Sequence, residues 1–327
     1  MIHFLARRFL RAAAVVALAV TAGFALAYAA PGDALTGDGS QVDRSAAATA
    51  VLRTRLGLDQ PFAVQYAQYL ARAVHGDLGT SRIEQRPVSA LLGEALAGSL
   101  LLSGTGLLLA VLVGLVIGSA EGWWPRLRTT RAAGTMLTAL YVVPEFVLAI
   151  TLIGVLAHGA GWFPTGGMAD PVISATGWPL ARALDVGRHL CLPALTLALA
   201  WGAAVARQQR AALAQTAGEP FVRTARAKGR GELAVLLRHA LPPAVTPVLT
   251  VVGLLLPALA GGAAIVEVVF AWPGMGTLVL RAVGQRDVPV LAGAIVVIAT
   301  VVAVSSLLVE VAIRLMDPRQ RLTPADA

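Results

Sequence analysis

The chain has 327 residues, of which 57% are hydrophobic and only 13% are charged, and its mean hydropathy is +0.74. Soluble domains carry about 25% charged residues, so the composition excludes an ordinary water-soluble domain and indicates a surface that faces hydrocarbon. The formal net charge of +8 would also suit a nucleic-acid binder, but no basic patch interleaved with aromatic residues supports nucleic acid as a partner.

Six apolar stretches are long enough for transmembrane helices, which need about 20 residues each. Each must be helical, because an isolated strand in lipid would leave backbone polar groups without partners. The sequence therefore predicts an all-α, polytopic membrane protein with six transmembrane helices. The predicted spans are Phe9–Ala30, Ala97–Ala120, Met136–Ala157, Leu190–Ala206, Val245–Phe270 and Val290–Ile313.

The first span has an alternative interpretation. The string "RRFLR", an apolar run and "AYA" resemble a secretory signal peptide with its small-residue cleavage site. However, the uncharged run from Ala12 to Ala30 is longer than the usual apolar region of about 7–15 residues. We therefore interpret residues 1–30 as a cytoplasmic N-terminus followed by an uncleaved span.

Residues 31–96 form a long segment on the predicted outer side. Phe62, Tyr66, Tyr69 and Leu70 recur there at helical spacing, which predicts a short amphipathic helix at the outer membrane interface. We interpret the segment from Trp178 to His189 in the same way. Either segment could instead be a landing surface for a protein outside the cell membrane.

The distribution of charge orients the chain. With the N-terminus inside, the inner segments carry sixteen basic and five acidic residues, whereas the outer segments carry ten of each. Cytoplasmic segments are enriched in lysine and arginine, so both termini, including the tail 315–327, are predicted to be cytoplasmic. The net positive charge is thus explained by membrane orientation.

Glu145 lies about midway along the third predicted span, next to Pro144. A charge at that depth costs roughly 2.5–3.5 kcal/mol on insertion scales, so its side chain should face protein or a water-filled path. A protonated structural glutamate and a residue on a substrate path both fit this position.

A basic loop within residues 207–244 separates the fourth and fifth spans. Glycines at 229 and 231 would each weaken a continuous helix by about 1 kcal/mol relative to alanine, so we predict two short helices joined by a bend. The pattern alone fits a helix lying on anionic headgroups or an element that docks a cytoplasmic partner. The predicted apolar face consists of Val222, Ala225, Gly229, Leu233, Leu236 and Ala240, beside a basic face of Arg223, Arg226 and Arg230.

The fifth span is interrupted by Gly253, Pro257, Gly261 and Gly262. Irregular helix is tolerated in a membrane only where neighbouring groups or a water-filled cavity satisfy the backbone. We therefore expect this span to border a transport path. Glu267, nearer its outer end, either lines an outer gate or lies at the membrane interface.

The basic loop resembles the signature loop of permeases in binding-protein-dependent ABC importers, in the dipeptide, oligopeptide and nickel branch. Arg223-Thr224-Ala225 matches the first triplet of that signature, Gly229 its glycine, and His239-Ala240-Leu241-Pro242 its end. The signature's usual glutamate and first alanine are absent, and Glu145 stands where the branch usually has a small residue. Other matching strings are "APGD" at 30–33, "LGLDQPFAVQYAQYL" at 56–70, "GWFPTGG" at 161–167, "LPALTLAL" at 192–199, "VVFAWPGMG" at 268–276 and "MDPRQR" at 316–321.

This resemblance, which covers residues 3 to 321, implies one permease subunit of an ATP-driven importer of dipeptides or oligopeptides in the cell inner (plasma) membrane. A nickel chelate or another small solute is the alternative cargo. The implied partners are a second homologous permease, two cytoplasmic ATPases, an extracytoplasmic substrate-binding protein and membrane lipid. Residues 97–314 would form the five-helix core that follows the first span and the outer segment.

The resemblance also implies roles for particular residues. The sequence lacks the nucleotide-binding pattern GxxxxGK[ST], so ATP is expected on a partner subunit, with no catalytic, cofactor or metal site in this chain. A membrane enzyme or a secondary transporter is less well supported, because no polar cluster or inverted repeat stands out. The expected ATPase-coupling residues are Arg223, Thr224, Ala225, Lys228, Gly229, His239, Leu241 and Pro242. The expected translocation path contains Glu145, Gly253, Pro257 and Glu267.

Overall fold

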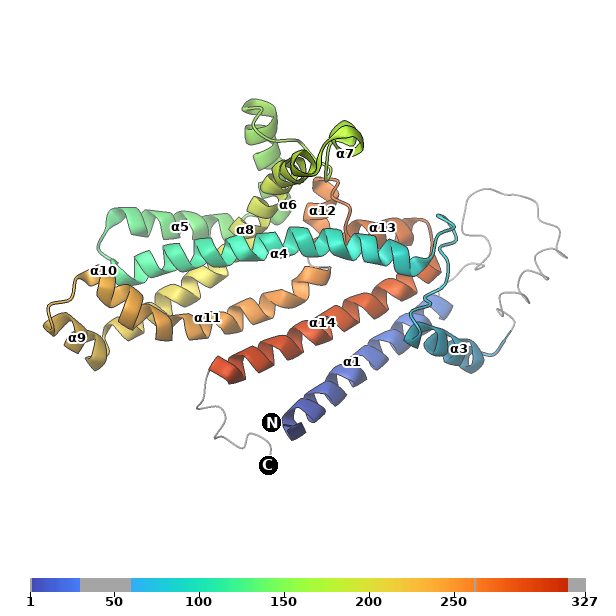
Figure 1. The fold of residues 1–327 in the computed structure, drawn as a ribbon, viewed down its shortest axis with the longest axis horizontal. Coiled ribbons are helices and arrows are strands. Elements are labelled where there is room, and N and C mark those ends of the chain that lie inside the picture. Colours follow the sequence, from blue (N-terminus) through green and yellow to red (C-terminus); the bar gives the residue numbers. More distant parts are fainter. Residues whose placement is uncertain (1, 30–59, 262, 317–327) are drawn as a thin grey trace. The chain divides into compact units, whose positions relative to one another are not determined.

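The structure is a computed structural model that describes residues 2–29, 60–261 and 263–316. The regular elements of these residues are helical, apart from one isolated antiparallel bridge between Thr80 and Pro87. The predicted all-α class is therefore confirmed. The α-helices are α1 (Ile2–Ala29), α3 (Phe62–Val74), α4 (Val88–Trp123), α5 (Arg128–Val142), α6 (Glu145–Leu152), α7 (Pro171–Thr176), α8 (Pro179–Ala217), α9 (Pro220–Ala227), α10 (Glu232–Val235), α11 (Leu241–Leu255), α12 (Ala264–Val269), α13 (Met275–Gly284) and α14 (Val288–Met316) (Figure 1).

Five helical segments are long and apolar enough to cross a membrane, and a sixth results if α5 and α6 are counted together. The first, second, fourth and sixth predicted spans lie within α1, α4, α8 and α14, apart from Ala30, which is outside the described residues. The predicted membrane class is thus confirmed, with the number of spans depending on how the pair is counted.

The third span is not the continuous helix that we predicted over Met136–Ala157. α5 ends at Val142, and α6 begins at Glu145 and continues as a π-helical segment, Ile153–Gly159. The two parts meet at an angle of 111°. Pro144 lacks a backbone N–H and disfavours helical geometry at the preceding residue, and Val143 is accordingly extended (φ −75°, ψ 128°).

The fifth span is interrupted as predicted, although Gly253 is not part of the break. α11 runs through Gly253 to Leu255 and continues as a 3₁₀ helix, Leu256–Ala260, with Pro257 in its first turn. The chain then leaves helical geometry at Gly261 and re-enters it in α12. Gly262 lies outside the described residues.

The segment Trp178–His189 is not a separate interfacial helix. Trp178 is the N-cap of α8, and the helix continues from Pro179 through Pro193 to Ala217. Its 39 residues correspond to a length of about 58 Å, roughly twice the hydrocarbon thickness of a bilayer. A single rod therefore joins the outer segment to the cytoplasmic loop of the predicted topology.

The chain divides into two compact units. The N-terminal unit comprises Met1–Gly98 and Gly274–Val304, and the central unit comprises Ser99–Pro273 and Ser305–Ala327. α4 and α14 each contribute to both units.

In the N-terminal unit, the helix that we predicted around residues 62–70 is present as α3, and it packs against α1. Phe24 stacks on Tyr69 with ring centroids 5.3 Å apart, and the hydroxyls of Thr21 and Tyr66 share a hydrogen bond. Tyr69 is only 8% exposed, and its burial raises the pKa of its hydroxyl to about 12. The aromatic side of α3 therefore belongs to the core of this unit.

A buried carboxylate fastens the loop before α4 in the same unit. Asp287 is 3% exposed and accepts a hydrogen bond of 2.5 Å from the hydroxyl of Ser81. The backbone N–H groups of Arg82 and Ile83 also donate to Asp287, each at 3.4 Å. The loop is thereby held to the turn between α13 and α14.

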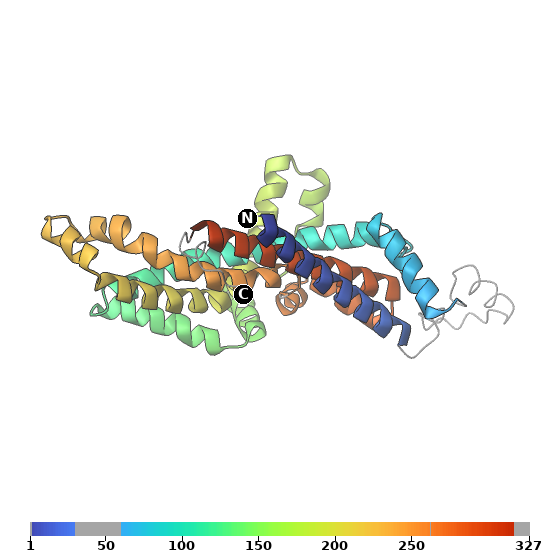
Figure 2. The ribbon, with the colours of Figure 1, turned by 90° about the horizontal axis from the view of Figure 1, so that it is seen from below.

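In the central unit, α8 is the helix on which α4, α5, α6, α9 and α11 assemble. Small residues let α4 approach α8 closely: a Cβ atom at Gly118 would collide with the carbonyl oxygen of Ala206. Such small-residue contacts are characteristic of helix packing in membranes. α9 and α10 lie at the end of α8 and α11 that is remote from α7 (Figures 1 and 2).

Candidate functional site

The basic loop is a bent helical hairpin, as the glycines predicted. α9 ends at Ala227, and α10 begins at Glu232. Gly229 between them has a φ of +75°, a left-handed geometry that glycine adopts without steric cost. No atom lies within 4 Å of the position that a Cβ of Gly229 would occupy. The requirement for glycine therefore comes from the backbone angle and not from crowding within the chain.

An arginine braces this bend. The guanidinium of Arg226 donates to both carboxylate oxygens of Glu232, at 2.9 and 3.3 Å. It also lies over the ring of Trp123, with its Cζ atom 4.6 Å from the ring centroid. The second contact joins the hairpin to the end of α4. Across the turn, Arg230 Nη1 lies 2.9 Å from His239 Nε2.

The inner side of the hairpin is packed against the transmembrane helices. Val222, Ala225, Val235, Leu236 and Ala240 are all buried, in one cluster with residues of α4, α8 and α11. α9 and the π-helical segment Leu236–Ala240 both contact α8. A displacement of the hairpin would therefore be carried directly into α8.

The continuous apolar face that we predicted does not pass through the bend. Leu233 is 59% exposed and Gly229 is also exposed, whereas Val235 is buried. The left-handed residue changes the direction of the chain, so the helical phase of α9 does not extend into α10. Sequence periodicity assumed one uninterrupted helix and therefore misplaced Leu233.

The outer side of the hairpin carries both charge and apolar area. Most of the expected coupling residues are exposed there, but Ala225 is buried, and His239 and Leu241 are half-buried. Sequence reasoning did not select the exposed apolar side chains of Phe221 and Leu237, and it placed Leu233 on the apolar face. The exposed residues are Phe221, Arg223, Thr224, Ala227, Lys228, Gly229, Arg230, Gly231, Glu232, Leu233, Leu237, Arg238, Pro242 and Pro243.

The residues expected on the path lie around a second region, where α6 and α12 pack together and α6 packs on α8. Glu145 is half-buried at the start of α6, and its carboxylate lies beside the side chain of Trp201 on α8. Glu267 on α12 is completely buried and accepts a hydrogen bond of 2.6 Å from the hydroxyl of Ser99. Gly253 lies instead against Val309 of α14.

The structure adds polar residues of α8 that sequence reasoning did not select. Arg210 Nη1 lies 3.5 Å from the Glu121 carboxylate, which is almost buried. One turn earlier, Arg207 is exposed, and its guanidinium lies over the ring of Tyr141. Sequence reasoning assigned Arg207 to the inner loop because the apolar window ended at Ala206.

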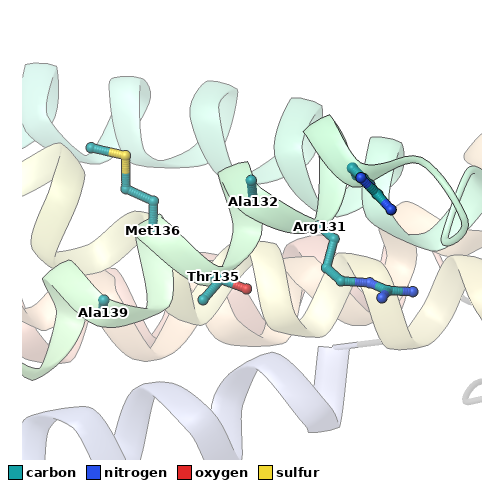
Figure 3. A pocket seen from close by; sticks show the side chains of 6 residues that line it. Arg131, Ala132, Thr135, Met136 and Ala139 are labelled. Carbon is teal, nitrogen blue, oxygen red and sulfur yellow. The ribbon is translucent and has the colours of Figure 1, made fainter.

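An open groove follows one side of α5 (Figure 3). Its lining comes from α5 alone, so it is a surface of one helix and not an enclosed pocket. Within the described ranges, no group of three or more His, Cys, Asp or Glu residues is placed to hold a metal ion. The groove is lined by Arg128, Arg131, Ala132, Thr135, Met136 and Ala139.

The sequence model for the binding-protein-dependent transport system inner membrane component matches residues 106–322. A separate model for the N-terminal part of such membrane components matches residues 1–89. The chain belongs to this family. The resemblance seen in the basic loop is thereby confirmed, and the chain is a multi-pass inner-membrane subunit of a transport system.

Named relatives agree with the family. A protein of Brucella ovis that is named as a peptide permease is 37% identical over 275 residues, covering 83% of this chain and 84% of the relative. The glutathione transport system permease protein GsiC of Salmonella choleraesuis is 33% identical over 322 residues, covering 98% and 99% of the two chains.

A solved structure shares the fold of this membrane component. An inward-facing conformation of the MetNI methionine ABC transporter aligns with a TM-score of 0.54 and 17% sequence identity, covering 69% of this chain and 96% of that chain. At this sequence identity the comparison supports only a shared fold.

Proposed function

We propose that this membrane component forms half of the translocation path of an ATP-driven importer of dipeptides or oligopeptides. Its partners would be a second homologous permease, two cytoplasmic ATPases and an extracytoplasmic substrate-binding protein. The observation that carries the proposal is the bent basic hairpin, which is exposed on one side and packed on α8 on the other. Peptide cargo is favoured by the names of the Brucella and Salmonella relatives.

In this proposal the outer side of the α9–α10 hairpin docks on an ATPase. Exposed Phe221, Leu233 and Leu237 offer apolar anchors among arginine and lysine side chains. Aromatic and arginine side chains are enriched in protein interfaces. A flat lipid surface requires basic residues on one side of a helix and apolar residues on the other, whereas here exposed apolar and basic residues are interspersed along the hairpin.

The proposed orientation places this hairpin and both termini in the cytoplasm. The support is the excess of basic residues in the segments that would face inward. The outer segment around α3 and the loop before α8 would then face the substrate-binding protein.

The proposed path follows the two interrupted spans and includes Glu145, Gly253, Pro257 and Glu267. Both interruptions remove regular backbone hydrogen bonds inside apolar segments, at Pro144 and around Gly261. Such backbone is tolerated at membrane depth only within protein or beside water. Because α6 and α12 contact each other, the two interruptions belong to one region of the central unit.

The test is reconstitution of this component with the permease, ATPase and binding protein encoded by neighbouring genes. Proteoliposomes should accumulate radiolabelled tri-alanine only when ATP and all of the subunits are present. Nickel chelates supplied in parallel should not accumulate. Uptake of the chelate without tri-alanine would replace the proposed cargo, and ATP-independent uptake would contradict the proposed mechanism.

A further inference from the structure

Two side chains of opposite charge lie beside the bend between α5 and α6. Glu145 is the first residue of α6, and its carboxylate lies beside the side chain of Trp201 of α8. On the α5 side, the Cζ atom of Arg207 lies 4.6 Å from the centroid of the Tyr141 ring. Tyr141 precedes Glu145 by four residues, so their Cα atoms are at most about 14 Å apart.

The guanidinium of Arg207 lies at the level of Tyr141, inside the third predicted span. Tyr141 follows Met136, the first residue of that span, by five residues, which corresponds to about 8 Å along the helix axis. Charged side chains inside a span face a bundle interior or a water-filled cavity, and they are rare against lipid. Since Arg207 is exposed in the single chain, the side of α8 that carries it faces an aqueous path or the second permease around that path.

Arg207 differs from the arginine one turn further along α8. Arg210 is paired with the Glu121 carboxylate at 3.5 Å. Across the portion of the chain that the structure describes, no carboxylate lies within 4.0 Å of Arg207, which contacts the Tyr141 ring instead. A cation–π contact holds a guanidinium in place but leaves its N–H donors available to an anion.

We propose that Glu145 and Arg207 form a site for a zwitterion, which binds the terminal ammonium and the terminal carboxylate of a short peptide during its passage. The inference rests on the proposed import of peptides and assigns the groups that hold them. The ammonium donates to the Glu145 carboxylate, and the guanidinium of Arg207 donates two parallel N–H groups to the peptide carboxylate, the arrangement that arginine favours. Trp201 and Tyr141 orient the two side chains.

We expect the site to favour peptides of two or three residues. An extended chain spans about 3.3–3.6 Å per residue, so dipeptides and tripeptides measure roughly 7–11 Å between their ends. This length is shorter than the upper limit of about 14 Å on the distance between the Cα atoms of Tyr141 and Glu145. Longer peptides would place only one terminus at the site.

The test is equilibrium binding of radiolabelled tri-alanine to the purified permease–ATPase complex in lipid nanodiscs, without the substrate-binding protein. Glu145→Gln and Arg207→Gln should each weaken binding about tenfold, the scale of one charge-assisted hydrogen bond. Arg207→Lys should weaken binding less than Arg207→Gln, because lysine keeps the positive charge but cannot form the paired hydrogen bonds. Arg182→Gln, which neutralises an exposed arginine at the outer end of α8, is the matched control and should bind like the wild type.

Modified ligands assign each terminus to one side chain. N-acetyl-tri-alanine should bind the wild type about tenfold more weakly than tri-alanine, and Glu145→Gln should weaken it no further. Tri-alanine amide should likewise bind the wild type about tenfold more weakly than tri-alanine, and Arg207→Gln should weaken its binding no further. These ligand changes test the site in the wild-type complex, so the result does not depend on whether a variant assembles.

The outcomes separate this site from the proposed function. Tri-alanine uptake by proteoliposomes together with unchanged affinity in both neutral variants would overturn the site and leave peptide import in place. Uptake without measurable binding to the wild-type complex would likewise overturn the site. Failure of the complete wild-type complex to take up tri-alanine would overturn both.

Discussion

Two bends in the central unit have different physical causes. The bend between α5 and α6 lies in an apolar segment and follows from Pro144, which has no N–H to donate. The bend between α9 and α10 lies in an exposed loop and follows from the left-handed geometry of Gly229, with the Arg226–Glu232 pair across it. One bend is imposed by a missing donor, whereas the other is permitted by a missing side chain.

The difference shows how each bend should respond to substitution. Restoring a donor at 144 allows a helix to form through the bend, and therefore changes the direction of the chain. Adding a side chain at 229 strains the left-handed backbone at this position. The backbone cannot easily adopt another conformation, because the buried face of the hairpin holds α9 and α10 in place. Removing the charge at 226 leaves the backbone preferences at both bends unchanged and only weakens the ion pair with Glu232.

Pro144→Ala should have the largest effect. Proline is about 3 kcal/mol less favourable than alanine inside a helix, so this substitution shifts the balance toward a straight helix by up to that amount. Spin labels at positions 136 and 150, both exposed, should move apart toward the separation of about 21 Å expected in a straight helix. Pro144→Gly is the control, because glycine restores the donor without favouring the helix. An unchanged label distance in Pro144→Ala would show that packing of α6 on α8 makes the bend.

Gly229→Val should have the next largest effect. A left-handed conformation costs roughly 1–2 kcal/mol for a residue with a Cβ, and a β-branched side chain is among the least suited to it. We expect less ATPase to co-purify and more ATP to be hydrolysed per peptide imported, with membrane insertion unchanged. Gly229→Asn should be milder, because asparagine tolerates this conformation. Equal defects in the two variants would indicate that the added side chain collides with the partner, and not that it strains the backbone.

Arg226→Gln should have the smallest effect. Exposed ion pairs contribute about 0.2–1 kcal/mol, and Arg226 is also in contact with Trp123. Co-purification of the ATPase should weaken slightly at low salt, and the difference from the wild type should shrink at high salt because exposed charges are screened. Glu232→Gln removes the ion pair but keeps the contact between Arg226 and Trp123, so it should reduce co-purification of the ATPase less than Arg226→Gln does. A salt-independent loss would assign the effect to the ring contact.

The sequence was sufficient to predict those helices and turns that are determined by residues close together in the chain. The apolar stretches located α1, α4, α8 and α14, and the glycines at 229 and 231 located the turn of the basic hairpin. The signature loop was also readable, because its residues follow one another in sequence. The exception was Pro144: the apolar run continues on both sides of it, so composition concealed a break that proline chemistry predicts.

Features that depend on distant residues could not be read in the same way. The ring of Tyr141 and the guanidinium of Arg207 meet only because α5 packs on α8. Glu267 is completely buried, and it accepts a hydrogen bond from Ser99, which is far away in sequence. Leu233 was misplaced because one left-handed residue resets the helical phase. Each of these positions is fixed by packing or backbone geometry and not by local propensity.

The length of α8 has a mechanical consequence. A stiff rod of about 58 Å acts as a lever: a tilt of about 5° about one end displaces the other end by about 5 Å. Pro193 removes one backbone hydrogen bond from this rod and so provides a compliant point along it. Because the α9–α10 hairpin contacts one end and the loop bearing α7 adjoins the other, a small tilt of α8 about the hairpin would displace the opposite end by several ångströms.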